Sequence, residues 1–148
     1  MKINHPLMHN NFSSSDMDSV RKLLKNKDLI LTQSKKVLEF ENKWSKWLGV
    51  KYSVFVNSGS SANFLSMLIL KSISSKKKEI IVPTLTWVSD INSVIMSGFK
   101  PVFVDINPQN LSMDEDQILK KINKNTLAVF ITHVQGFNGL SDRLLKTL

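Results

Sequence analysis

A run of small polar residues lies between an apolar segment and a helical pattern, and its composition suits a ligand-binding turn. The apolar residues 54–56 lead into residues 57–61 (Asn-Ser-Gly-Ser-Ser), and the helical pattern begins at Ser60 or Ser61. The free N–H groups and positive dipole end of such a helix bind phosphate readily. We expect Gly59 to let the chain turn and an anion approach, while Ser60 and Ser61 add hydroxyl donors. The same residues also fit a simple helix cap.

Three further loops carry polar or aromatic residues directly after apolar segments. Trp87 stands at a helix start, where it could stack on a planar ring or staple the helix. His133 could be an acid, a base or a donor, or could serve the structure alone. Asp105 could bind a ligand or cap the turn at Asn107 and Pro108. If the segments are parallel strands, all these loops converge at one crevice beyond their carboxyl ends.

The elements that would position these loops alternate regularly from residue 51 onward. Short apolar runs predict strands at 52–56, 79–82, 101–104 and 128–132. Between them, helical patterns cover 60–71, 87–96 (closed by Gly98) and 112–122, the last opened by a capping box from Ser112 to Glu115, and another begins at Ser141. This order predicts the α/β class, with three layers in which helices cover both faces of a mostly parallel sheet.

The N-terminal residues follow a different, purely helical pattern. After an extended entry over residues 1–12, a helix is expected to start at 13–16, and a second is capped by Ser34 and ended by Gly49. The second helix carries one apolar face, and its two tryptophans fit packing better than chemistry: Val37, Phe40, Trp44, Trp47 and Leu48. We therefore expect an N-terminal helical segment over 1–50 and an α/β region over 51–148.

Composition narrows the class of protein. The 148 residues are 42% hydrophobic and include no cysteine, and no apolar run is long enough to cross a membrane. We expect a cytoplasmic protein without disulfides. The net charge of +8 raises nucleic-acid binding as a hypothesis, with the helix over 34–47 as its element. The lysines are scattered, however, and only two arginines occur, so we expect no nucleic-acid partner.

Several common site motifs are absent from the sequence. It has no phosphate loop ending in Gly-Lys-Ser/Thr, no G-x-G-x-x-G fingerprint, and no second glycine that would make residues 59–63 a nucleophile elbow. His5, His9 and His133 do not have the spacing of metal ligands, so no metal site is expected.

Read together, the loops resemble one family. Residues 56–62 (Val-Asn-Ser-Gly-Ser-Ser-Ala), 79–88 (Glu-Ile-Ile-Val-Pro-Thr-Leu-Thr-Trp-Val) and 98–106 (Gly-Phe-Lys-Pro-Val-Phe-Val-Asp-Ile) resemble the pyridoxal-phosphate-dependent nucleotide-sugar aminotransferases of the DegT/StrS type, which have fold type I. The resemblance spans roughly residues 6–142 and includes 31–37, 40–41 and 132–136. Residues 5–8, 86–89 and 136–142 look closest to the deoxyhexulose 3-dehydrases of lipopolysaccharide sugar synthesis.

The resemblance implies roles for individual residues. Gly59, Ser60 and Ser61 would hold the phosphate of pyridoxal 5'-phosphate or pyridoxamine phosphate, and Trp87 would stack on its ring. Thr32 and Gln33 would lie near the substrate, and His133 would be an accessory near the cofactor. The implied partners are a nucleotide-linked keto-sugar, an amino-acid donor and a second copy in a homodimer.

The departures from the family concern catalysis. Family members are more than twice as long and carry an Asp that pairs with the pyridine nitrogen and a Lys for the Schiff base, replaced by His in the dehydrases. Neither has a counterpart here, so we expect no catalytic residue within this chain and no turnover by it alone. The uncovered helix over 141–148 indicates an N-terminal piece of an incomplete large domain. The alternative is a non-catalytic module for phosphate ligands or subunit assembly.

Overall fold

The computed structural model describes residues 10–74 and 76–148. These residues divide into two compact units, one ending at Phe55 and the other beginning at Val56. Each unit is described by itself. The segment 5–8, which contributed to the family resemblance, lies outside the described residues, as does most of the predicted extended entry.

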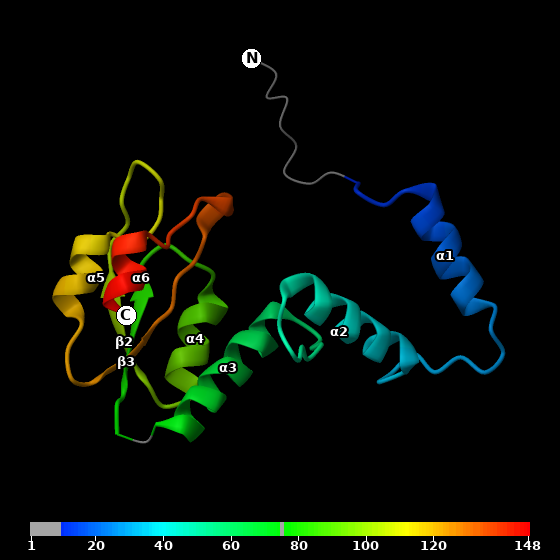
Figure 1. Cartoon of the computed structure of the whole chain (residues 1–148), viewed down its shortest axis with the longest axis horizontal. Coiled ribbons are helices and arrows are strands. Elements are labelled where there is room, and N and C mark those ends of the chain that lie inside the picture. Colours follow the sequence, from blue (N-terminus) through cyan, green and yellow to red (C-terminus); the bar gives the residue numbers. More distant parts are fainter. Residues whose placement is uncertain (1–9, 75) are drawn as a thin grey trace, which may run out of the picture. The chain divides into compact units, whose positions relative to one another are not determined.

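The first unit contains two helices whose ends follow from local chemistry (Figure 1). Helix α1 (Ser14–Leu24) begins with a reciprocal capping box, in which Ser13 and Asp16 each accept the other's backbone N–H. The Ser13 hydroxyl, and after it the Ser13 backbone N–H, donate to the Asp16 carboxylate and lower the pKa of Asp16. Helix α2 (Lys35–Leu48) is capped by Ser34 and ends at Gly49, which has a φ of 76°. The predicted boundaries of α2 are confirmed, because a left-handed residue at this position favours glycine.

Aromatic side chains gather along the predicted apolar face of α2. The ring centroids of Phe40 and Trp44 are 5.9 Å apart, and those of Trp44 and Trp47 are 4.8 Å apart. Phe40 also meets Phe55 edge to face, at 5.4 Å. The rings therefore pack on one another, although Trp47 stays 74% exposed.

The second unit is built on a three-stranded parallel sheet in the order β2-β1-β3. Its strands are β1 (Glu79–Pro83), β2 (Lys100–Val104) and β3 (Thr126–Val129). Its helices are α3 (Gly59–Ile73), α4 (Val88–Met96), α5 (Glu115–Lys121) and α6 (Asp142–Thr147), with a short 3-10 turn η1 (Val134–Gly136). The left-handed Gly98, with a φ of 81°, follows α4 as predicted.

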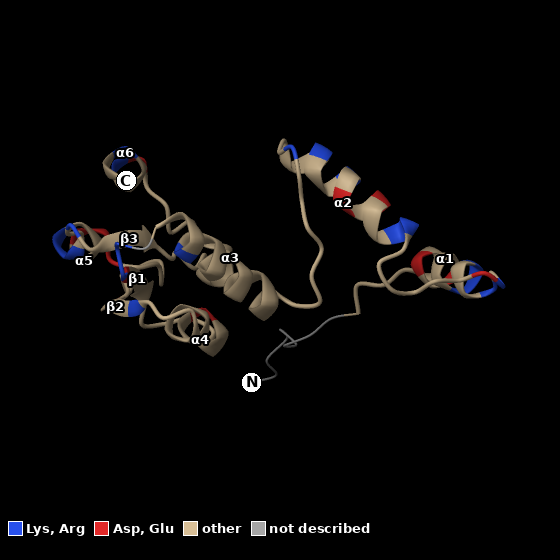
Figure 2. Ribbon diagram, turned by 90° about the horizontal axis from the view of Figure 1, so that it is seen from below, with Lys and Arg blue, Asp and Glu red and all other residues tan. Residues whose placement is uncertain are grey.

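The alternation of side chains along β1 separates two cores, one on each face of the sheet. Ile80 and Val82 pack with Met67 of α3 and Val94 of α4. Ile81, which points the other way, packs on the opposite core with Ile118 of α5 and Leu144 of α6. Two helices thus cover each face, as Figure 1 and Figure 2 show. The predicted three-layer α/β architecture is confirmed.

The predicted strand at 52–56 is wrong. These residues are not part of any strand, and Tyr52 and Val54 are 75% and 80% exposed. The backbone N–H of Phe55 donates to a carboxylate oxygen of Glu41, at 2.8 Å. A strand requires a neighbouring strand for its hydrogen bonds, and among the described residues none pairs with this segment.

Two further boundaries differ from the prediction. Asp114, not Ser112, caps α5, and its side chain accepts the N–H of Gln117 at 2.9 Å. Ser112 instead donates its hydroxyl to Asn110. Strand β3 begins at Thr126 rather than 128, because its pairing with β1 already starts opposite Glu79.

Lysine and arginine are distributed unevenly over the second unit. Figure 2 shows basic residues on α5 and at the end of α3, whereas α4 carries none. In the sequence, residues 56–70, 83–99, 104–113 and 126–142 contain no lysine or arginine. These segments include every loop at the carboxyl ends of the strands.

In the part of the chain that the structure describes, no helix has the length and apolar character needed to span a bilayer.

At the opposite edge of the sheet, where the strands begin, the carboxylate of Glu79 connects β1 with β2 and with the segment before β3. Glu79 of β1 accepts hydrogen bonds from Asn123, at 2.9 Å, and from Lys100 of β2, at 3.0 Å. The bond from Asn123, followed by that from Lys100, lowers the pKa of Glu79 below its usual value of 4.5. A lowered pKa in the folded state stabilises the fold above the unfolded-state pKa, and this contribution disappears as the pH falls through the folded-state value.

We therefore expect Glu79→Gln to remove part of the acid sensitivity of the fold. Urea unfolding should give a lower free energy of unfolding for the variant at about pH 7, and the gap to the wild type should close between about pH 5 and pH 3. Asp28→Asn, which alters an exposed carboxylate, is the control. Parallel pH profiles for wild type and Glu79→Gln would contradict this assignment.

Candidate functional site

The beginning of α3 presents unused backbone donors. Ser58 is the N-cap, and its hydroxyl oxygen accepts the N–H of Ser61 at 3.2 Å. The Ser61 hydroxyl donates to the side-chain oxygen of Asn57 at 2.6 Å. Among the described residues, none accepts the N–H of Gly59 or Ser60. Two amides and the positive end of a 15-residue helix are therefore available to an anion.

Gly59 has a different role from the one expected for the turn. It is the first residue of α3 and does not have a positive φ. A Cβ added at this position would meet nothing within 4 Å. The turn therefore does not require glycine, and the prediction is wrong on this point. The position that a Cβ of Gly59 would occupy is open space.

A buried carboxylate, Asp90 of α4, connects the start of α3 with two strand-end loops. Asp90 is 7% exposed, and one of its oxygens accepts the side-chain amide of Asn63 at 2.6 Å. The other accepts the hydroxyl of Thr86, which lies after β1. Thr132, which lies after β3, is 2.8 Å from the Thr86 hydroxyl and 3.3 Å from Asp90. Three segments thus meet at the carboxyl-terminal edge of the sheet.

Sequence reasoning missed Asp90 and Asn63. Asp90 occupies the first turn of α4, where an acidic residue is ordinarily explained by the helix dipole. Asn63 lies among apolar residues of α3, in a helix that was predicted from its apolar periodicity. The available signal was a lone carboxylate beside the β1–α4 loop, in a segment without any basic residue.

Trp87 follows Thr86 directly and is the N-cap of α4, without a side-chain cap bond. Its side chain is 75% exposed, so it does not staple the helix. Because Thr86 is bonded to Asp90, and Asp90 to Asn63, the loop that carries Trp87 is connected through side chains to the start of α3. The structure brings these two predicted elements to the same edge of the sheet.

His133 and Asp105 both make local structural bonds. His133 is exposed, and its Nδ1 accepts the backbone N–H of Gly139 at 3.0 Å, which closes the loop over 133–139. One Asp105 oxygen accepts the N–H of Ile106, at 2.8 Å, and the hydroxyl of Thr84, at 3.3 Å. The neighbouring turn is capped by Asn107, which accepts the N–H of Gln109. The expected turn cap therefore comes from Asn107 and not from Asp105.

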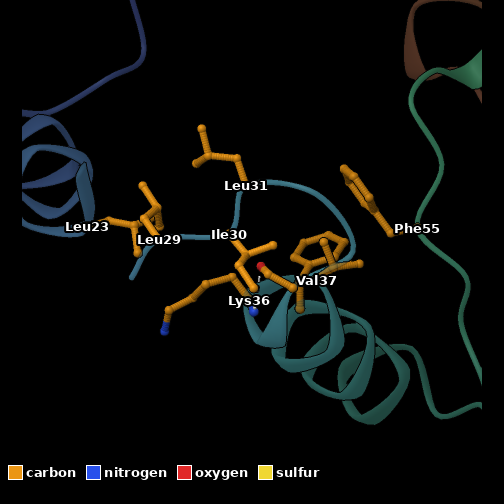
Figure 3. Close-up of a pocket in the computed structure, with 9 residues that line it drawn as sticks. Leu23, Leu29, Ile30, Leu31, Lys36, Val37 and Phe55 are labelled. Atoms are coloured by element: carbon orange, nitrogen blue, oxygen red, sulfur yellow. Dashed lines mark hydrogen bonds between the residues drawn. The ribbon is translucent and has the colours of Figure 1, made fainter. Parts of the chain in front are cut away.

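Thr32 and Gln33 belong to the first unit, whereas the other candidate residues belong to the second. Both are exposed, and Gln33 has a left-handed φ of 44°. They lie between α1 and α2, beside an apolar groove of about 280 Å³ that Figure 3 shows in close-up. The groove is lined by side chains of both helices, of their connector and of the last residue of the unit: Leu23, Leu29, Ile30, Leu31, Ser34, Lys36, Val37, Phe40 and Phe55.

With this geometry in hand, comparison with known proteins identifies the family. Residues 11–143 match the DegT/DnrJ/EryC1/StrS aminotransferase family. The chain belongs to this family. The membership agrees with the resemblance carried by the three loop motifs, and it accounts for the open α/β sheet with its loops at one edge.

Two curated family members illustrate the similarity. A UDP-4-amino-4,6-dideoxy-N-acetyl-beta-L-altrosamine transaminase of Campylobacter jejuni is 34% identical over 133 residues, which are 90% of this chain and 34% of that protein. A GDP-4-keto-6-deoxy-D-mannose 3-dehydratase of Yersinia pseudotuberculosis is 28% identical over 97% of this chain and 37% of its own length.

A solved family member has the same fold. It is the Escherichia coli GDP-4-keto-6-deoxy-D-mannose-3-dehydratase with bound hydrated PLP. It superposes with a TM-score of 0.79 at 28% identity, covering 88% of this chain and 34% of that one. The chain therefore spans about a third of the length of the relatives that it matches.

The His133 bond gives a direct test of the structural role. We expect His133→Ala to lower the free energy of unfolding by about 0.5–1 kcal/mol, because the exposed Gly139 N–H exchanges a side-chain acceptor for water. Urea denaturation followed by circular dichroism measures this change. Unchanged stability would show that this bond does not hold the 133–139 loop.

Proposed function

We propose that this chain forms the first part of the cofactor-binding domain of a pyridoxal-phosphate-dependent nucleotide-sugar aminotransferase or related sugar 3-dehydrase. In this proposal the N–H groups of Gly59 and Ser60, with the hydroxyl of Ser60, hold the cofactor phosphate. The Ser61 hydroxyl would join them by releasing its hydrogen bond to Asn57. The observation that carries the proposal is the pair of N–H groups at the start of α3 that no described residue accepts, beside an unobstructed Gly59.

The donor set fits a phosphate group. The strand-end loops contain no lysine or arginine, so the anion would be bound by amides, hydroxyls and the helix dipole rather than by a cation. Trp87 provides the second contact, because its exposed indole stands free to lie against the pyridine ring. A phosphate contact and a stacking contact together would orient the ring.

Pyridoxal phosphate, when bound, supplies an electron sink for chemistry at a carbon that carries nitrogen. The residues of this chain bind and orient it. Lys100 is not suited to a covalent role, since it begins β2 at the far edge of the sheet and pairs with Glu79. Lys76 and Lys78 precede β1 at that same edge. We therefore propose that the 148-residue chain does not turn over substrate by itself.

The names of the relatives support a proposal for the complete reaction. These names support a nucleotide-linked keto-sugar as substrate and the transfer of an amino group from an amino-acid donor. From the family resemblance we further propose a cytoplasmic homodimer and a place in surface-polysaccharide synthesis such as that of lipopolysaccharide. Thr32 and Gln33 would face the substrate, and the strained backbone of Gln33 suits such a role. Residues 1–50 would form an N-terminal helical segment and 51–148 the first part of the cofactor domain, with His133 as an accessory residue.

Binding of pyridoxamine phosphate tests the proposed site. This compound carries the phosphate and the ring but no aldehyde, so it does not react with surface lysines. Calorimetric titration of the 148-residue chain should detect binding that inorganic phosphate displaces, and pyridoxamine without phosphate should bind about tenfold more weakly. Trp87→Ala should weaken binding by up to about tenfold through loss of stacking.

Trp47→Ala is the matched control, because Trp47 is 74% exposed and Trp87 is 75% exposed. Equal losses in the two variants would indicate non-specific binding to exposed indoles. Phosphate-displaceable binding that is indifferent to Trp87 would instead favour a simple phosphate-ligand or assembly module. Transaminase turnover by the chain would contradict the proposed lack of activity.

Gly59→Ala separates anion binding from folding. The added Cβ meets nothing within 4 Å, so the melting temperature should stay the same or rise slightly. Affinity for pyridoxamine phosphate should fall about fivefold, because in this proposal the phosphate approaches through the open space at Gly59 that the methyl group would fill. Gly49→Ala should do the reverse, since a φ of 76° disfavours alanine while the position lies outside the proposed site. Equal affinity for wild type and Gly59→Ala would contradict the proposed approach of the phosphate.

A further inference from the structure

Asp90 is a buried carboxylate that the proposed binding contacts do not use. It is 7% exposed, and among the described residues no lysine, arginine or histidine forms an ion pair with it. Burying such a group costs free energy unless hydrogen bonds satisfy it. The amide of Asn63 and the hydroxyl of Thr86 satisfy one oxygen each. A buried polar cluster of this kind holds its members in one arrangement.

The direction of each hydrogen bond in the cluster follows from the number of donors. Thr86 has one hydroxyl hydrogen, which it donates to Asp90. Thr132, at 2.8 Å from the Thr86 oxygen and 3.3 Å from Asp90, therefore donates mainly to Thr86. Asn63 donates from its amide nitrogen. Asp90 accepts at both oxygens, and neutral donors from α3, from the loop after β1 and from the segment after β3 surround it.

The positions of these donors in the chain give the cluster its significance. Asn63 lies one helical turn after Gly59, on the same side of α3. Thr86 immediately precedes Trp87. The two side chains that bind Asp90 therefore belong to the two segments that would bind opposite ends of the cofactor, the phosphate and the ring.

We propose that Asp90 is a positioning residue that fixes the separation between the phosphate-binding amides of α3 and the ring-stacking Trp87. It reaches neither end of the ligand itself. This inference rests on the proposed cofactor site. Fixing the two contacts at one distance makes them cooperate, because a ligand that engages one is already placed for the other.

The test compares two ligands on the 148-residue chain, one that makes both proposed contacts and one that makes only the phosphate contact. Inorganic phosphate needs only the α3 amides, whereas pyridoxamine phosphate needs those amides and Trp87. Asn63→Ala, which cuts the link between α3 and Asp90, should weaken pyridoxamine phosphate about tenfold and change phosphate affinity less than about twofold. Asp90→Asn, which keeps the size but removes one acceptor, should act in the same direction.

A double-mutant cycle on ligand affinity distinguishes a positioning role of Asp90 from a role in stability alone. If Asp90 positions Trp87, then Trp87→Ala should cost little further affinity in the Asn63→Ala background. Ser93→Ala is the control, because Ser93 is buried in the same helix and donates to the backbone oxygen of Asp90, not to its carboxylate. It should lower thermal stability and leave the affinity ratio of the two ligands unchanged.

Hydrogen exchange on the wild-type chain supplies a measurement that does not depend on the variants folding. Added inorganic phosphate should slow exchange at 59–61 and also at 86–90 if the cluster couples them. Slowing at 59–61 alone, or full additivity in the cycle, overturns the positioning role while the phosphate site stands. No binding of pyridoxamine phosphate by the wild-type chain overturns the proposed cofactor site and this inference with it.

Discussion

The hydrogen bond from Asn63 to the buried carboxylate of Asp90 is the interaction on which the geometry of the candidate site depends. It crosses from one helix to the next, and it is the polar contact between helices that otherwise meet through apolar side chains. The hydrophobic contribution of apolar packing is non-directional and does not by itself specify one register of the two helices. A 2.6 Å hydrogen bond to a buried charge does specify one, because leaving that charge unsatisfied is costly. The start of α3 is therefore held in register with the β1–α4 loop.

The parallel sheet places the strand-end loops at the same edge as the start of α3. Strand β1 is buried on both faces, with Ile80 and Val82 toward α3 and α4 and Ile81 toward α5 and α6. Because all three strands are parallel, the loops after them open at one edge. Glu79 joins the strands at the other edge, together with Lys100 and Asn123. The two edges thus differ in chemistry: one carries lysines and a paired carboxylate, and the other carries neutral donors around Asp90.

Features decided by neighbours in the chain could be predicted from the sequence. Ser34 and Gly49 define α2 because a cap and a left-handed residue act within one turn. Strand β1 was found because its apolar run is the buried centre of the sheet, and β2 was found because its apolar run pairs with β1 at the edge. The run at 52–56 is apolar as well, but among the described residues no strand pairs with it. Whether an apolar run has a partner strand cannot be read from its neighbours in the sequence. The Asp90 cluster was missed because its hydrogen-bonded members are separated by up to 46 residues in the sequence.

The site residues proposed from the sequence, Gly59, Ser60, Ser61 and Trp87, remain proposals, but the charge pattern constrains how they could work. With no lysine or arginine in the strand-end loops, a phosphate at α3 would have only dipolar donors at an exposed helix end. Such contacts contribute about 0.3–1 kcal/mol each when solvated. Phosphate binding of this strength would not retain a cofactor alone, so a second contact at a fixed distance becomes necessary. A rigid spacing between the α3 amides and Trp87 is then a requirement of the chemistry, and Asp90 is the described residue whose bonds can supply it.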